Sequence, residues 1–157
     1  VVQNTIASGR EDIDCCLVTD EAMGTANTRD PKVINSLDRC HTINRPENAL
    51  EANGYTFHRI KYFPFEPGTD PYNQGLDWSD LTAQICSNRP IISVKAWDDG
   101  GTHSEVITGF HRDPDASVDV DTHGMDGFYT ESFQDYRGEP GVSKHVRDYI
   151  DIHSIGQ

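Results

Sequence analysis

Polar and apolar residues alternate along much of the second half of the chain. The clearest run is SEVITGF, residues 104–110, which follows the pair Gly100-Gly101 and a single histidine, His103. Alternation over this length predicts a β-strand with one buried face, and places His103 at the mouth of that strand. The same pattern predicts further strands at residues 55–63, 90–97, 117–121, 127–133 and 146–154.

Helical spacing and capping residues predict helices mainly in the first half of the chain. The two clearest segments are residues 11–24, which Asp14 can cap, and residues 76–90, which Asp77 can cap. In both, apolar side chains recur four residues apart, as one face of a helix requires. Weaker signals predict helices at residues 30–40 and 45–54, and residues 63–75, rich in Pro and Gly, are predicted to form a loop.

The order of these elements, mostly helices and then strands, favours an α+β fold with helices packed on an antiparallel sheet. A length of 157 residues suits one domain, residues 1–157, with a core large enough to fold without a metal or disulfide. The sequence begins with Val1 and has no signal-peptide pattern, so we expect a mature or trimmed product.

The charge balance is strongly acidic, with a formal net charge of −13 at pH 7. Such a surface repels phosphates, so we expect no nucleic-acid partner. No apolar run approaches the roughly 20 residues that a membrane span needs, so we expect no membrane partner either.

Three residues are candidates for nucleophilic chemistry. Cys15 lies at a predicted helix start, where the helix dipole stabilises a thiolate, although the acidic residues around it oppose this. His103 follows a flexible turn and could serve as the base that a nucleophilic cysteine needs. Asp121, at the end of residues 117–121, could orient the imidazole from the neighbouring strand. Taken alone, each residue fits an ordinary structural role better: a buried or disulfide-bonded cysteine, a surface histidine at a turn, and an aspartate at a solvent-facing edge of the sheet.

Metal sites are weaker alternatives. Residues 113–121, DPDASVDVD, space their acids as a calcium loop does, but they lack the central Gly and closing Glu of an EF-hand. Three histidines, His103, His111 and His123, have no recognised zinc-ligand spacing. We therefore expect no metal and no cofactor.

The order of these motifs resembles the short bacterial papain-like cysteine proteases, including the bacteriocin-processing peptidases and related secreted or effector proteases. Residues 88–110, NRPIISVKAWDDGGTHSEVITGF, are similar to the family segment that carries the catalytic histidine. Residues 15–23, CCLVTDEAM, match the segment of the nucleophile more loosely, with Glu21 six residues after Cys15. The strand SVDVD matches the segment of the orienting Asp or Asn.

The resemblance implies a papain-like domain, with helices carrying the nucleophile packed on the sheet that carries His and Asp. It implies a cysteine endopeptidase in which Cys15 attacks the peptide bond, His103 transfers the proton and Asp121 orients His103. The oxyanion residue would be Gln3, although the usual family position before the cysteine is occupied here by Gly9. We expect a secreted or delivered monomer acting on a peptide or protein. The alternative is a non-catalytic secreted binding module on the same fold.

The four cysteines allow two disulfides. If the protein is secreted, the expected pair is Cys40 with Cys86, because Cys15 must stay reduced to work and Cys16 lies in the same helical turn.

Overall fold

A computed structural model describes residues 46–112, 116–122 and 127–156 of the chain. Their elements are α3 (Pro46–Ala52), β1 (Tyr55–Lys61), α4 (Trp78–Cys86), β2 (Ile91–Trp97), β3 (Thr102–His111), β4 (Ser117–Thr122), β5 (Gly127–Ser132), α5 (Phe133–Arg137), β6 (Gly138–Glu139) and β7 (Ser143–Ser154). The predicted helices at residues 11–24 and 30–40 lie outside the described residues. Among the described helices, none is long and apolar enough to cross a membrane.

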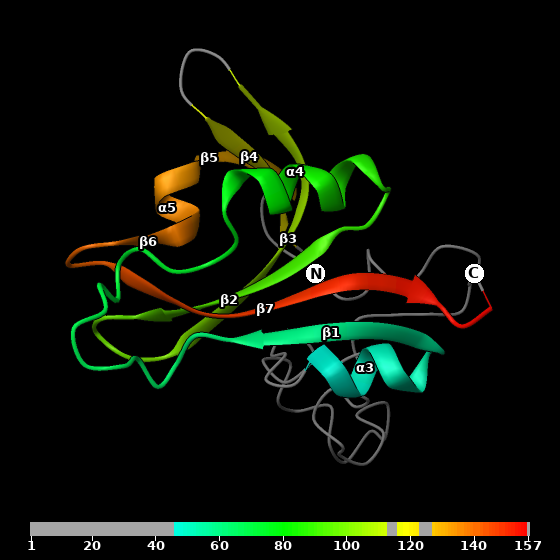
Figure 1. Ribbon diagram of the computed structural model, residues 1–157, viewed down its shortest axis with the longest axis horizontal. Coiled ribbons are helices and arrows are strands. Elements are labelled where there is room, and N and C mark those ends of the chain that lie inside the picture. The colour runs from blue at the N-terminus through cyan, green and yellow to red at the C-terminus, as the bar shows by residue number, and fades with distance from the viewer. Residues whose placement is uncertain (1–45, 113–115, 123–126, 157) are drawn as a thin grey trace, which may run out of the picture.

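The strands form one antiparallel sheet in the order β1-β7-β2-β3-β4-β5, and the short β6 pairs with β7. The last strand of the chain, β7, therefore lies between β1 and β2, as Figure 1 shows. The expected α+β class with an antiparallel sheet is confirmed.

Each face of the sheet carries a hydrophobic core. Helix α3 covers the first face, where Leu50 packs with Ile92 and Val106. Helices α4 and α5 cover the second face, where Leu81 and Tyr136 join the second core. Neighbouring residues of β2 and β3 alternate between the two cores, because successive side chains of a strand point to opposite faces. The prediction of a single buried face for residues 104–110 is therefore wrong, because both faces of the central strands are covered.

Local signals placed several elements correctly. Asp77 caps α4, and its side chain accepts a hydrogen bond from the backbone N–H of Asp80 at 2.8 Å. The turn after α3 ends at Gly54, whose φ of 77° a side chain would disfavour. Residues 63–75 form no helix or strand, as predicted.

The sequence did not predict α5 and β6, and it placed the start of the last strand too late. Residues 127–133 form β5 only as far as Ser132, whose side chain then caps the short helix α5. The last strand begins at Ser143, earlier than the alternation of residues 146–154 indicates. Its first residues pair with β6, which ends just before it in the chain, and with β2, which is distant in the chain.

Candidate functional site

The β2–β3 hairpin places His103 at the start of β3. Its turn contains Gly100 and Gly101, with φ angles of 114° and 85°, which favour glycine. The backbone N–H of Trp97 donates to the Gly101 carbonyl at 3.0 Å and closes the hairpin. His103 is directly opposite Lys95 on β2 and is half-buried. The two glycines are therefore what permits a tight turn beside this histidine.

The ring of His103 lies against Trp97. The two ring centroids are 5.9 Å apart with an interplanar angle of 30°. Trp97 is 38% exposed and lines an open cavity of about 360 Å³ together with Asp99, Gly141 and Val142. The indole thus connects the imidazole to a surface cavity that an extended ligand could enter.

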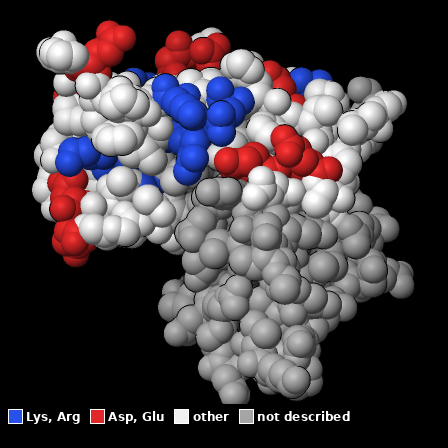
Figure 2. Space-filling model, turned by 90° about the horizontal axis from the view of Figure 1, so that it is seen from below, with Lys and Arg blue, Asp and Glu red and all other residues white. Residues whose placement is uncertain are grey.

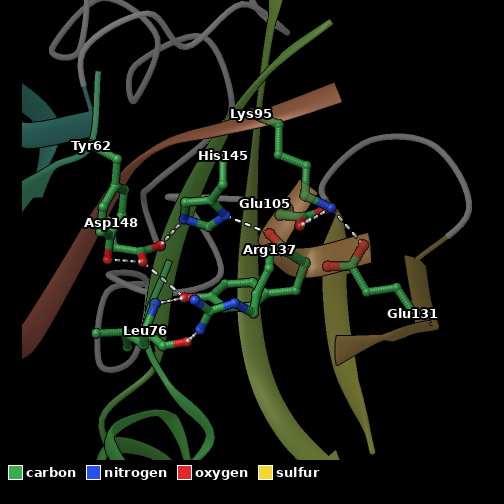
Figure 3. Close-up of polar contacts among 9 residues, drawn as sticks. Tyr62, Leu76, Lys95, Glu105, Glu131, Arg137, His145 and Asp148 are labelled. Carbon is green, nitrogen blue, oxygen red and sulfur yellow. Dashed lines mark hydrogen bonds and ion pairs between the residues drawn. The ribbon is translucent and has the colours of Figure 1, made fainter. Parts of the chain in front are cut away.

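A buried charged cluster shares the face of the sheet with His103. The Lys95 ammonium lies 3.0 Å from a Glu105 carboxylate oxygen and 2.6 Å from a Glu131 oxygen (Figure 3). The Tyr129 hydroxyl donates to the other Glu105 oxygen at 2.7 Å. These side chains come from β2, β3 and β5, so the cluster connects three strands beside the candidate histidine.

The pKa shifts of the cluster follow from its burial and its two like charges. Burial and the negative charge of Glu105 raise the pKa of Glu131 to about 8. Burial opposes ionisation of Glu105, yet the Lys95 ammonium holds the pKa of Glu105 below its usual value. Burial likewise disfavours the charged Lys95, but both carboxyl groups raise the Lys95 pKa overall. At neutral pH the cluster therefore favours one ammonium, one carboxylate and one neutral carboxyl group.

A second polar cluster is buried on this face. His145 and Asp148 are fully buried on β7, and the Tyr62 and Tyr136 hydroxyls both donate to Asp148 at 2.8 Å (Figure 3). Ser93 of β2 is directly opposite both Glu105 and Asp148, so it lies between the two clusters. A polar band thus crosses the sheet beneath α4 and α5.

Asp121, the predicted orienting residue, is 5% exposed on β4. It is directly opposite Val106 of β3, and paired residues share a face of the sheet. His103 precedes Val106 by three positions, so the two side chains point to opposite faces. The structure therefore brings Lys95 and Glu105 to the face of His103, and does not bring Asp121 there. The proposed role of Asp121 stays a prediction from sequence.

The predicted nucleophile Cys15 and the predicted oxyanion residue Gln3 lie outside the described residues. Cys86, near the exposed end of α4, carries a free thiol. Cys86 is thus unpaired among the described residues, which does not support the expected Cys40–Cys86 disulfide. Because Cys40 lies outside the described residues, the pairing stays a prediction from sequence.

The histidine and aspartate residues considered as metal ligands have other contacts. The imidazole of His111 bonds to the Asp119 carboxylate at 2.8 Å, and the Thr130 hydroxyl donates to the same carboxylate. His123 lies outside the described residues. In the part of the chain that the structure describes, no group of three His, Cys, Asp or Glu side chains could hold a metal ion.

Sequence reasoning did not identify Lys95, Glu105 or Glu131 as members of one cluster. A signal was present: Lys95 and Glu105 interrupt the apolar runs of two strands joined by the Gly-Gly turn. Opposite charges within two adjacent buried strands indicate an internal ion pair, because an unpaired buried charge is costly. The contribution of Glu131 required knowledge of the β4–β5 pairing.

Comparisons of the chain with models of protein families, with curated proteins and with solved structures found no match.

Proposed function

We propose that the protein is a papain-like cysteine endopeptidase in which His103 is the general base. The observation that carries this proposal is the position of His103 at the start of β3. It is half-buried, follows the turn with two glycines, and lies against Trp97, which lines a cavity. A general base needs a fixed ring with one side open to the reacting group. The packing against Trp97 fixes the imidazole ring, and the adjoining cavity supports an open side for the reacting group.

The chemistry assigned to this site is acyl transfer. The Cys15 sulfur attacks the scissile carbonyl, while His103 takes the thiol proton and returns it to the leaving amine. Water then attacks the resulting thioester, with His103 again taking a proton, and the Cys15 thiol is released. Gln3 and the backbone N–H of Cys15 would stabilise the oxyanion, a contribution of about 3–4 kcal/mol where such donors are well aligned.

The residue that orients His103 is the open part of the mechanism. Asp121 is the choice from sequence, but its carboxylate points to the other face from the imidazole. Glu105 shares the face of His103, although Lys95 and Tyr129 already hold its carboxylate. The proposal therefore rests on Cys15 and His103. The residue that orients the His103 imidazole is tested separately with a variant of Asp121.

Thiol labelling tests the proposal directly, because the chain contains its own reference thiol. The native protein would be treated with an epoxide-type thiol inhibitor, and the labelling rates of Cys15 and the exposed Cys86 compared by peptide mass spectrometry. We expect Cys15 to react at least about ten-fold faster than Cys86, since a thiolate is the reactive form. The His103→Ala variant should lose this excess and keep the Cys86 rate.

The same experiment can overturn the proposal. Equal labelling of Cys15 and Cys86 in the parent protein, or an unchanged Cys15 rate in His103→Ala, would show that no thiol–imidazole pair exists. The second candidate function, a non-catalytic binding module, would then be preferred. It is favoured by one observation, the opposite orientation of His103 and Asp121.

A further inference from the structure

The groove on the first face of the sheet, near the His103 end, combines two cations with apolar walls. It has a volume of about 380 Å³, and its lining residues are Lys61, Phe63, Ala96, Thr102, Val146 and Arg147. Thr102 directly precedes His103 in β3, so their side chains point to opposite faces and the groove lies across the sheet from the candidate base. A peptide held at His103 would therefore reach the groove only with a part that passes around the β2–β3 end of the sheet.

The two cations of the groove face each other across the sheet. Lys61 of β1 is directly opposite Arg147 of β7 in the strand register. Like charges in this position repel and destabilise the pair. The chain has 26 acidic residues for 13 basic ones, yet no ion pair joins Lys61 or Arg147 to an acid among the described residues. The repulsion is therefore uncompensated in this part of the protein.

An aromatic ring holds Arg147 in place. Its guanidinium lies 5.7 Å from the centre of the Tyr149 ring, and within residues 46–112, 116–122 and 127–156 its buried Nε has no hydrogen-bond partner and no acid pairs with it. A guanidinium fixed in this way keeps its forked donors oriented, which is the arrangement that binds a carboxylate through two hydrogen bonds. Lys61 is exposed and can adjust to a bound group.

The surrounding surface adds to the positive charge. Arg59 is two residues before Lys61 on the same strand face, and the Glu47 carboxylate lies 3.6 Å from it. Next to the groove there are thus three cations and one acid. Figure 2 shows a cluster of Lys and Arg side chains with a group of Asp and Glu side chains beside it, on a molecule that is acidic as a whole.

We propose that this groove binds an acidic side chain, Asp or Glu, of the peptide substrate. The two cations would take the carboxylate, while Phe63, Ala96 and Val146 contact the aliphatic part of the side chain. The inference rests on the proposed peptidase function, and it adds a preference for an acidic residue at a distance from the cleaved bond, because the groove and His103 lie on opposite faces of the sheet. Binding at such a site weakens with salt, because exposed charges are screened.

A binding assay tests the groove without requiring cleavage. The full chain carrying Cys15→Ala would be titrated against two fluorescein-labelled hexapeptides that differ only in a central Glu or Gln, with fluorescence anisotropy as the readout. We expect the Glu peptide to bind at least about ten-fold more tightly at 50 mM salt, a ratio typical of one charge-assisted hydrogen-bond pair. The ratio should shrink at about 500 mM salt.

Matched variants locate the interaction. Lys61→Gln should reduce the preference for the Glu peptide to about threefold or less, and Lys61→Arg should retain it. Arg89→Gln removes a cation that pairs with Asp151, is not among the residues lining the groove and lies beyond the other end of β2, so it should leave the preference unchanged. Equal binding of the two peptides, or an unchanged preference in Lys61→Gln, would overturn the proposal.

The outcomes for the groove and for the peptidase are separable. A Lys61-dependent preference in a chain that cleaves no peptide would support the groove and reject the peptidase. Cleavage through Cys15 with no preference for acidic residues would support the peptidase and reject the groove. If an acidic part of this chain already occupies the groove, the Glu and Gln peptides would bind with equally low affinity. That result would also overturn the proposal.

Discussion

The imidazole of His145 lies 2.8 Å from the carboxylate of Asp148, and neither side chain is exposed. The other ring nitrogen is 2.5 Å from the Tyr136 carbonyl oxygen, which can only accept. The two contacts therefore connect β7 to α5 through a buried imidazole that is bonded at both ring nitrogens.

Replacing Asp148 should destabilise the protein strongly. Asp148→Asn replaces one of the two acceptor oxygens that bond to the His145 imidazole and to the Tyr62 and Tyr136 hydroxyls, so at least one buried polar group loses its partner. Each buried polar group left unsatisfied costs about 1–3 kcal/mol. Urea denaturation would measure the change in the free energy of unfolding. The control is Tyr62→Phe, which removes one hydrogen bond and should cost about 1 kcal/mol; similar losses in both variants would show that Asp148 contributes no more than this one hydrogen bond.

The raised pKa of Glu131 predicts a pH dependence of stability. Its folded-state pKa of about 8 exceeds the ordinary value of 4.5, so the folded protein binds more protons than the unfolded chain between these values. The free energy of unfolding from this group should therefore be highest below about pH 4.5 and fall as the pH rises to about 8. Glu105, with a lowered pKa, contributes in the opposite sense only on the acidic side.

Thermal unfolding of parent and Glu131→Gln at pH 5, 6.5 and 8 would measure this dependence. A glutamine keeps the shape of the neutral carboxyl group without the titration. The variant should lose less stability than the parent between pH 5 and pH 8. Parallel curves for the two proteins would show that Glu131 is ionised throughout that range.

His103→Ala should lower kcat/KM for a peptide substrate by about 10²–10⁴-fold, the usual contribution of a positioned general base. His111→Ala is the matched control, because His111 lies on the same strand, is exposed, and bonds only to Asp119 among the described residues. We expect the control to stay within threefold of the parent. Activity would be followed with an internally quenched peptide pool, and an active His103→Ala protein would exclude His103 as the base.

Asp121→Asn distinguishes the sequence-based triad from the arrangement in the structure. Because the Asp121 carboxylate points away from the imidazole, we expect kcat/KM and its pH profile to stay within about threefold of the parent. A loss of 100-fold or more, with a shifted acidic limb of the pH profile, would support the triad and mean that this face rearranges when substrate binds. Circular dichroism would establish that the variant is folded, since Asp121 is buried.

Local signals in the sequence were sufficient for most elements of the described chain. The alternation of residues 104–110 and 117–121 predicted β3 and β4, and Asp77 marked the start of α4. These features depend on residues close together in the chain, where side-chain period and capping act directly. The antiparallel α+β class followed from their order.

The tertiary structure alone decided which side chains meet. The sequence placed His103 and Asp121 on neighbouring strands, but a one-residue difference in register reverses the face of every side chain. It also could not show that β7 lies between β1 and β2, which brings Lys61 opposite Arg147 and Asp148 opposite Ser93. Register is fixed by hydrogen bonds and packing between distant segments, so it is set by the whole sheet and not by the pattern of any one strand.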